Sequence, residues 1–388
     1  MSVPTRIFGS HDERTVAQLR RCADAGDATR AVLCADGHLG YSQPIGGAIA
    51  YEDAISPSGV GFDIGCGNKA VLTPIHAADL DVPQTMDEIY ERISFGMGRK
   101  NREPVDHPVL DQIRDADFEP QRELLDLAAA QLGTVGAGNH YVDLFADQED
   151  RVWVGVHFGS RGFGHKTATA FIERQGDMDA PPTLLAADSG RGQAYIAAMR
   201  LAGAYAYAGR DIVVDKVLEI LGAEAIDEVH NHHNYAWLEE HDGRDVWVVR
   251  KGCTPAFPGQ RGFVGASMGE ASVILEGVDS PDSAEALYST VHGAGRAMSR
   301  TKAAGKWRKR DGKRVREGGA IDFDEVTREL AAAGIELRGG AADEAPAAYK
   351  RLAEVLEAQG ERTIRVTHRL RPLGVAMAAA DTVDPFKD

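Results

Sequence analysis

A histidine followed at once by glycines lies near the last quarter of the chain, in the run His292-Gly-Ala-Gly-Arg296. Glycine has no Cβ, so this backbone leaves room for a bulky ligand to approach the imidazole. Arg296 adds a planar guanidinium that can donate two hydrogen bonds to one phosphate. Histidine can act as a covalent nucleophile. Two interpretations stand on these residues alone: a nucleophile beside a phosphate clamp, or a helix-capping histidine beside a packing glycine.

Other glycine-flanked segments carry donors of the kind that bind transition metals. In Gly61-Phe-Asp-Ile-Gly-Cys-Gly67 a carboxylate and a thiol stand three residues apart, where they could bind one metal ion or bridge two. This segment lacks the Gly-Lys-Ser/Thr ending of a phosphate-binding P-loop. The candidate donors along the chain are Asp63, Cys66, His140, His157, His233 and His292. Mixed thiolate, imidazole and carboxylate donors suit zinc, manganese or iron rather than calcium or magnesium. Each of them is also explained singly as a structural cysteine, a turn-capping aspartate or a core histidine.

The charge of the chain is unevenly distributed. The 388 residues carry a formal net charge of −16, yet residues 296–316 hold ten Lys or Arg against one acid, so the remainder carries −25. The negative total argues against a protein that coats nucleic acid with its whole surface. The basic run is either a solvated loop or a segment that binds a polyanion.

The elements that must position these groups are short strands and helices without a regular alternation. Hydrophobic periodicity predicts helices at about 14–25, 83–95, 120–132, 322–333 and 345–359, with one long or two short helices over 191–221. It predicts strands at 31–34, 152–157, 245–250, 272–275 and 363–369. Neither a repeat nor a long linker interrupts the chain, so we predict one α+β domain over residues 1–388. Four cysteines without paired spacing, and no apolar run of transmembrane length, predict a cytoplasmic protein without a membrane partner.

Taken together and in order, these segments resemble the motifs of the RtcB family of RNA-splicing ligases. The matching segments are Cys34-Ala-Asp-Gly-His38, Gly61-Phe-Asp-Ile-Gly-Cys-Gly67, Leu132-Gly-Thr-Val-Gly-Ala-Gly-Asn-His140, His157-Phe-Gly-Ser-Arg161-Gly-Phe-Gly164, His232-His-Asn-Tyr235, Arg250-Lys-Gly252, Ser267-Met-Gly269 and His292-Gly-Ala-Gly-Arg296. Asp343-Glu-Ala-Pro346 with Tyr349-Lys350 extends the match, which covers about residues 30 to 375. The resemblance implies mixed β-sheets flanked by helices around a central metal-lined cleft.

The resemblance also implies an activity. Members of the family are GTP- and manganese-dependent ligases that join an RNA 3′-phosphate or 2′,3′-cyclic phosphate to a 5′-hydroxyl, as on tRNA halves or damaged RNA. By similarity, Cys66 would bridge two Mn²⁺ ions whose other ligands are Asp63, His140, His157 and His233. His292 would attack the α-phosphorus of GTP and form a covalent GMP-histidine. The GMP would pass to the RNA 3′-phosphate, and the 5′-hydroxyl would then displace it. An archease-type activator is a further candidate partner.

The same resemblance assigns the nucleotide pocket and reveals departures from the family pattern. The nucleotide would contact Asn139, Asp143, Asn234, Ser267, Ser272, His292, Arg296 and Tyr349, and phosphates would contact Arg161 and Arg296. Asp143 stands where the family usually has glutamate, and Met377 where it has a lysine that meets the guanine nucleotide. A basic insertion at about 300–318 and a C-terminal extension at about 378–388 are further features of this chain.

These departures keep two alternatives open. One is a divergent member of the family with altered nucleotide or RNA-repair specificity. The other is a metal-stabilised RNA-binding protein that does not ligate.

Overall fold

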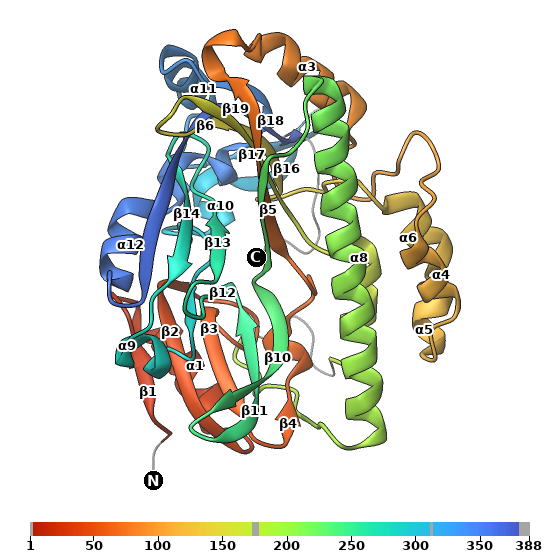
Figure 1. Cartoon of the computed structure of the whole chain (residues 1–388), viewed down its shortest axis with the longest axis vertical. Coiled ribbons are helices and arrows are strands. Elements are labelled where there is room, and N and C mark those ends of the chain that lie inside the picture. The colour runs from red at the N-terminus through yellow and green to blue at the C-terminus, as the bar shows by residue number, and fades with distance from the viewer. Residues whose placement is uncertain (1–2, 173–177, 311–312, 380–388) are drawn as a thin grey trace.

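The computed structural model describes residues 3–172, 178–310 and 313–379, with the side chains of 309–315 outside this description. One of its two large β-sheets lies in the lower half of Figure 1. This sheet has five strands, in the order β1 (Thr5–Ile7), β2 (Ala28–His38), β3 (Ile45–Tyr51), β11 (Arg244–Lys251) and β10 (Asn234–His241). β1 pairs with β2 in parallel, and the other neighbours in this sheet are antiparallel.

The second sheet has eight strands and carries most of the predicted ligands at one edge. Its order is β13 (Arg261–Val264), β14 (Ser272–Gly277), β19 (Ile364–Ala379), β6 (Tyr141–Ala146), β7 (Arg151–Phe158), β5 (Gly67–His76) and β9 (Asp227–His232), with β18 (Glu336–Gly340) also pairing with β19. In the antiparallel register, Gly67 at the start of β5 is opposite Phe158 on one side and His232 on the other. The beginnings of β5 and β6 and the ends of β7 and β9 therefore meet at one edge.

His233 stands where the chain leaves one sheet for the other. It is the single residue between β9 in the eight-stranded sheet and β10 in the five-stranded sheet. β12 (Cys253–Pro255) and β15 (Ser289–Val291) form a short antiparallel pair, and β15 leads directly into His292. β4 (Ala54–Ile55) and β8 (Leu185–Ala186) form another short pair.

Helix α8 (Gly190–Leu221) supports this junction along one side of the molecule (Figure 1). Ser189 caps its start by accepting the N–H of Gly192, and Gly222 ends it in the left-handed conformation at φ 61°. Its C-terminal half buries Val213, Val214 and Val217 against the β5–β7 part of the sheet. The sequence allowed one long helix or two short ones here, and the chain forms one.

The other described helices are shorter than α8. They are α1 (Glu13–Ala23), α2 (Pro57–Val60), α3 (Val82–Arg92), α4 (Pro108–Arg114), α5 (Glu119–Arg122), α6 (Leu125–Gln131), α7 (Arg161–Thr169), α9 (Pro281–Glu285), α10 (Arg300–Ala304), α11 (Phe323–Ala332) and α12 (Leu352–Gln359), with single 3₁₀ turns at Ala77–Asp79, Ala342–Glu344 and Pro346–Ala348. The helix predicted at 120–132 is divided into α5 and α6. The prediction of a helix over 345–359 was wrong for its first half, because Tyr349 is extended (φ −118°, ψ 161°). The strand predicted at 363–369 is confirmed and continues to Ala379.

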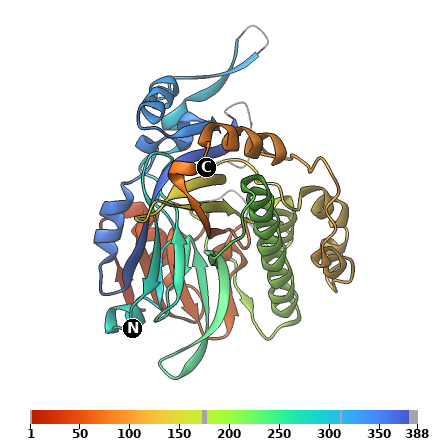
Figure 2. The ribbon, with the colours of Figure 1, turned by 45° about the horizontal axis from the view of Figure 1, so that its top comes forward.

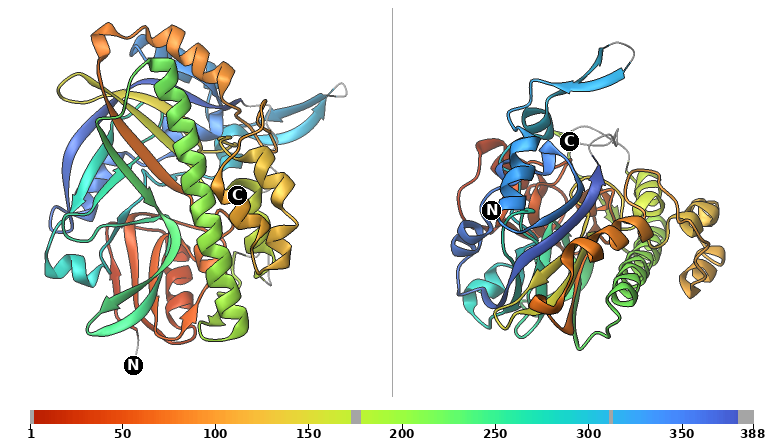
Figure 3. Two further views of the ribbon diagram at one scale, coloured as in Figure 1. Left: turned by 45° about the vertical axis from the view of Figure 1, so that its right-hand side comes forward. Right: turned by 90° about the horizontal axis from the view of Figure 1, so that it is seen from above.

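The basic segment forms secondary structure rather than a plain loop. After α10 the chain makes the antiparallel pair β16 (Lys306–Arg310) and β17 (Lys313–Glu317). Figures 2 and 3 show this hairpin projecting away from the body of the molecule. The predicted α+β fold class is confirmed, with both sheets flanked by helices. Apart from Ala378 and Ala379, the predicted C-terminal extension lies outside the described residues.

Within the described part of the chain, none of the helices combines the length and apolar character that crossing a membrane requires.

Candidate functional site

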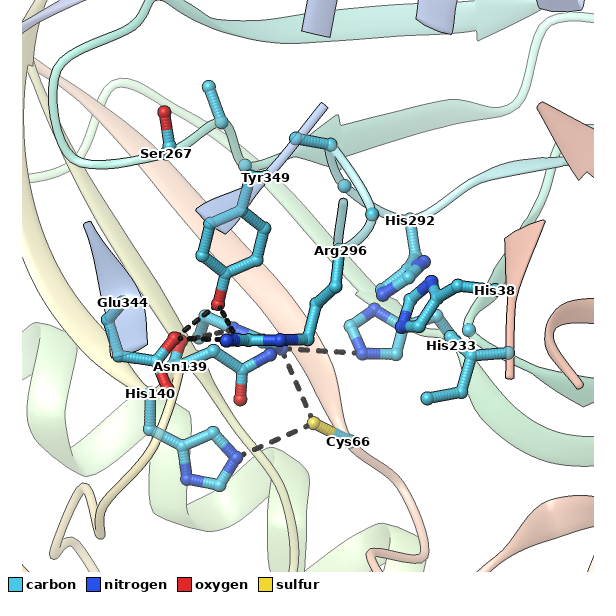
Figure 4. Close-up of a pocket in the computed structure, with 18 of the residues that line it drawn as sticks. His38, Cys66, Asn139, His140, His233, Ser267, His292, Arg296, Glu344 and Tyr349 are labelled. Carbon is cyan, nitrogen blue, oxygen red and sulfur yellow. Dashed lines mark hydrogen bonds and ion pairs between the residues drawn. The ribbon is translucent and has the colours of Figure 1, made fainter. Parts of the chain in front are cut away.

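A cavity of about 600 Å³ opens at the junction between the two sheets. Among the predicted site residues it is lined by Asp63, Cys66, Asn139, His140, Asp143, His157, His233, Asn234, Ser267, His292, Arg296 and Tyr349. Figure 4 shows side chains from widely separated segments pointing into this space. The structure thus brings together nearly all the residues that the motifs singled out.

Two groups of potential metal ligands share one thiol. Asp63, Cys66 and His140 form one group, and Cys66, His157 and His233 form the other, with the ligand atoms of each group within 4.8 Å of one another. The Cys66 Sγ lies 3.8 Å from Nε2 of His140 and 3.4 Å from Nε2 of His157. This donor set fits transition metal ions of the zinc or manganese kind, with Cys66 placed to contact an ion in each group.

Backbone carbonyls orient two of these imidazoles. Nδ1 of His140 lies 3.0 Å from the Val135 carbonyl, and Nδ1 of His157 lies 2.9 Å from the Asn139 carbonyl. A carbonyl only accepts, so each Nδ1 carries a proton and each ring turns its Nε2 towards Cys66. Burial, with the neighbouring His140, lowers the pKa of His157 to about 3. Burial also lowers the pKa of His233. Both rings are therefore neutral at pH 7, which is the form that binds metals.

The Asp63–Cys66 loop is packed tightly against the end of β7. A Cβ built on Gly159 would lie 2.2 Å from Oδ1 of Asp63, so only glycine allows this approach. Burial pushes the pKa of Asp63 up, but the hydrogen bond and charge of His140 and the charge of Arg161 hold it below its usual value. Burial and Asp63 raise the pKa of the Cys66 thiol, against the opposing charge of Arg210. A bound cation is what favours the thiolate here.

His292 is held by a carboxylate that the sequence analysis did not single out. Oδ2 of Asp36, on β2, accepts the backbone N–H of His292 at 2.9 Å and lies 2.6 Å from its Nδ1. Asp36 is fully buried, and a Cβ on Gly295 (φ 72°) would lie 2.2 Å from its carbonyl oxygen. With Nδ1 engaged, Nε2 is the nitrogen of His292 left for chemistry. The capping alternative is not what the structure shows, because His292 follows strand β15 and begins no helix.

Arg296 faces the cavity as part of a hydrogen-bonded group. Its guanidinium donates to the hydroxyl of Tyr349 at 2.8 Å and to a carboxylate oxygen of Glu344 at 3.4 Å (Figure 4). The same guanidinium lies over the Tyr349 ring, 4.8 Å from its centroid. Arg300 makes ion pairs with Glu344 and Asp343. These two cations at the rim suit anionic groups of a ligand.

Three polar atoms on residues that line the cavity have no hydrogen-bond partner among the described residues. They are the hydroxyl of Tyr141, Oδ1 of Asp143 and Oγ of Ser267, all on buried side chains. Burial raises the pKa of Asp143 well above its usual value, although the Ala376 amide opposes the shift. Met377, also buried, lines the same wall. Buried polar atoms without partners are costly, so this part of the wall is suited to a ligand with hydrogen-bonding edges.

Two predicted contacts lie elsewhere. Ser272 is buried behind the wall and accepts the Ala266 N–H at 3.0 Å, so it supports the Ser267 loop. Arg161 is outside the cavity lining, with its Nε 3.4 Å from Oγ1 of Thr134 and its guanidinium against Gly136.

Asn234 is in the wall but also has a positioning role. Its amide bridges the Asp63 carbonyl and the Gly252 N–H.

Some residues that line the cavity were not predicted as site residues from the sequence. They include His38, Lys251, Arg300 and Glu344. Nδ1 of His38 lies 3.0 Å from the Asp36 carbonyl, and Lys251 donates to the Tyr41 carbonyl at 2.6 Å. His38 and Lys251 stand inside quoted motifs, which is the signal that could have found them.

Comparison with known proteins gives one consistent result. A family model described as tRNA-splicing ligase RtcB matches residues 18–378. The RNA-splicing ligase RtcB of Escherichia coli strain K12 is 32% identical to this chain, over 87% of each protein. The tRNA-splicing ligase RtcB of Thermococcus kodakarensis is 30% identical over 97% of this chain and 95% of its own length. That of Archaeoglobus fulgidus is 31% identical over 90% and 88%.

Proposed function

The chain belongs to the RtcB family of RNA-splicing ligases, and we propose that it joins an RNA 3′-phosphate or 2′,3′-cyclic phosphate to a 5′-hydroxyl with GTP and two Mn²⁺ ions. The observation that carries the proposal is the pairing of His292 with Asp36 beside two ligand groups that share Cys66. A nucleophile held by a buried carboxylate and a site for divalent ions then share one cavity.

The metal ions would be held by the two ligand groups. Asp63, Cys66 and His140 would bind one ion, and Cys66, His157 and His233 the other. When bound, divalent ions polarise phosphoryl oxygens and offset the negative charge that develops on them. Manganese and zinc both accept these donors, so the proposal of Mn²⁺ follows the family rather than the donor chemistry.

The first step belongs to His292. Its Nε2 attacks the α-phosphorus of GTP, a P–N bond forms, and the bond to pyrophosphate breaks. The imidazole acquires positive charge as the P–N bond forms, and Oδ2 of Asp36, 2.6 Å from Nδ1, stabilises that charge. The contact with Asp36 also turns Nε2, rather than Nδ1, towards the nucleotide.

The later steps transfer the GMP. An oxygen of the RNA 3′-phosphate attacks the same phosphorus and breaks the P–N bond, which frees His292. The 5′-hydroxyl then attacks the RNA phosphorus, and GMP and the hydroxyl proton are released. Arg296 and Arg300 at the rim would bind the phosphates, exchanging their contacts with Glu344 for the ligand. Asp143, Ser267 and Tyr141 would contact the base.

The hairpin of β16 and β17 would contact the RNA outside the cavity. It follows α10 directly, and Arg300 at the start of α10 lines the cavity. At its base, Arg316 lies over the Trp307 ring and 3.6 Å from Asp343, which also pairs with Arg300. A basic ribbon on an otherwise acidic protein is a suitable surface for the RNA backbone.

The experiment is guanylylation with α-labelled GTP and Mn²⁺, followed by denaturation. Wild type should retain an acid-labile label, and His292→Ala should retain none. The same preparations are given RNA with 3′-phosphate and 5′-hydroxyl ends, and, as a control, RNA with 3′-hydroxyl and 5′-phosphate ends. RNA joining without protein label, or equal label on His292→Ala, would contradict the mechanism. RNA binding without either reaction would favour a non-ligating RNA-binding protein.

A further inference from the structure

One arginine, Arg210, lies fully buried in the middle of α8, on the side of the helix that faces the eight-stranded sheet. Its Nη1 donates to the carbonyls of Gly65 at 2.9 Å and Phe158 at 2.6 Å. Its Nη2 lies 3.0 Å from Nδ1 of His232, and its Nε donates to Nε2 of His230 at 2.9 Å. A single planar group therefore contacts three separate segments of backbone or side chain.

Each of these three segments carries a ligand of the same group at the next position. Gly65 precedes Cys66, Phe158 follows His157, and His232 precedes His233. Backbone hydrogen bonds already join these segments in part: the strand register places Gly67 opposite Phe158 and His232, and the Cys66 carbonyl accepts the His233 N–H at 2.8 Å. Arg210 adds side-chain hydrogen bonds that join all three segments on the side of the sheet that faces α8. Cys66, His157 and His233 are the second ligand group.

The chemistry of this contact is specific to a guanidinium. None of the four acceptors is a carboxylate, so the buried cation has no direct ion-pair partner among them, an arrangement that costs free energy. Its face also lies over the Tyr207 ring, 5.1 Å from the centroid. The donors point in fixed directions in one plane, whereas a lysine ammonium is one compact donor that cannot reach all these acceptors at once.

We propose that Arg210 is a positioning residue for the metal site, which sets the spacing of Cys66, His157 and His233 through the residues next to them. The inference rests on the metal site of the proposed function. Residues outside the ligand set that orient ligands typically change metal affinity by about 10- to 100-fold when they are altered. The alternative is that Arg210 only stabilises the packing of α8.

Another buried arginine provides the matched control. Arg250, on β11, is also fully buried, and it contacts Glu239, Ser289 and Leu287, none of which is adjacent to a proposed metal ligand. Arg250→Lys removes a buried guanidinium and should lower the unfolding temperature without changing the metal site. Arg210→Lys also removes a buried guanidinium, and it should both lower the unfolding temperature and change the metal site.

The experiment titrates Co²⁺ into the metal-free full-length protein and follows the thiolate charge-transfer and d–d absorption. Wild type gives the reference affinity and spectrum. For Arg210→Lys we expect affinity at the site that includes His157 and His233 to fall about 10-fold or more, with an altered d–d spectrum. For Arg250→Lys we expect the wild-type spectrum and affinity. Thermal unfolding of each metal-free variant is measured alongside.

The outcomes separate the two roles. Wild-type affinity and spectrum in Arg210→Lys, with a lowered unfolding temperature, would overturn the positioning role. Equal loss of affinity in Arg250→Lys would also overturn it, since any buried arginine would then matter as much. If wild type itself binds no Co²⁺, both this inference and the proposed metal site fail, whereas wild-type binding with unchanged variants overturns this inference alone.

Discussion

The carboxylate of Asp36 holds His292 at two points, with one oxygen 2.9 Å from its backbone N–H and 2.6 Å from its Nδ1. This oxygen fixes both the position and the tautomer of the ring. It also supplies negative charge next to an imidazole that would become positive in the proposed attack. The role matches that of the orienting acid in hydrolytic triads, although here the histidine itself is the proposed nucleophile.

Asp36→Asn should therefore slow transfer of GMP to His292 by up to about 10⁴-fold, because the orienting group loses its charge and no longer fixes the tautomer of the ring. Single-turnover labelling with α-labelled GTP measures the rate. Metal affinity of the same variant should remain that of wild type, because Asp36 is not in either ligand group. Labelling at the wild-type rate would show that the Asp36 contact is only structural.

The shared position of Cys66 predicts an unequal response of the ligands to substitution. Cys66→Ser should weaken both ions, since this thiol belongs to both groups, whereas His140→Ala and His233→Ala should each weaken one. Metal content after equilibration with Mn²⁺ and gel filtration checks this by elemental analysis. Two ions retained by Cys66→Ser, or two lost from either histidine variant, would rule out the shared arrangement.

Asp143 is predicted to read the edge of the base. A guanine edge presents two N–H donors, which favour the charged form of Asp143 that burial alone disfavours, while an asparagine amide presents a donor of its own and leaves one guanine donor unpaired. Asp143→Asn should lower labelling by GTP at least about 10-fold relative to ATP. Competition between the two labelled nucleotides gives the ratio. An unchanged ratio excludes the base contact, and equal use of several nucleotides by wild type would favour a divergent member of the family.

The proposed metal ligands show which part of the site could be predicted from the sequence and which could not. Cys66, His140 and His157 stand at strand ends beside glycines, so their local setting could be read from the chain. Their convergence depends on the order β6, β7, β5, β9, which is not sequential and cannot be read from periodicity. The resemblance to the family motifs, rather than periodicity, is what grouped these residues into one predicted site.

Two misses have physical causes. Asp36 stands in the motif Cys34-Ala-Asp-Gly-His38, but it is 256 residues from His292, and nothing in either segment marks the two as partners. The helix predicted at 345–359 fails before Leu352 because Tyr349 extends to meet Arg296, and tertiary contact overrides local propensity. The hairpin was missed because its strands consist mostly of charged residues, which carry little hydrophobic alternation.

The pH dependence of stability should carry the signature of His38. Burial, with the nearby charges of His292 and Lys350, lowers the pKa of His38 to about 4, although the Asp36 carbonyl and carboxylate oppose the shift. The unfolded value is about 6.5. Between these values the unfolded chain binds a proton that the folded chain does not, so the unfolding free energy falls as the pH falls, by up to about 1.4 kcal/mol per pH unit.

His38→Gln removes this proton uptake. In urea unfolding of the metal-free protein, its stability should fall less steeply than that of wild type between pH 6.5 and about pH 4, by up to one proton. Above pH 7.5 the two dependences should run parallel, whatever the difference in absolute stability. Identical slopes below pH 6.5 would mean that His38 takes up its proton in the folded state as readily as in the unfolded state.

The basic hairpin predicts a defect in RNA binding that leaves the nucleotide chemistry intact. Arg308, on β16, has a side chain that is 67% exposed, and its Nε lies 3.8 Å from a carboxylate oxygen of Glu317. In the sequence it is far from the proposed metal ligands. Arg365, on β19, is its matched control, with 68% exposure and a glutamate partner 3.1 Å away.

Arg308→Glu should raise the KM for RNA about 10-fold and make RNA binding less dependent on salt, because a phosphate contact is lost. Labelling by GTP should not change, and Arg365→Glu should leave both measurements as in wild type. Equal weakening by the two variants would mean that the RNA responds only to the overall charge of the protein.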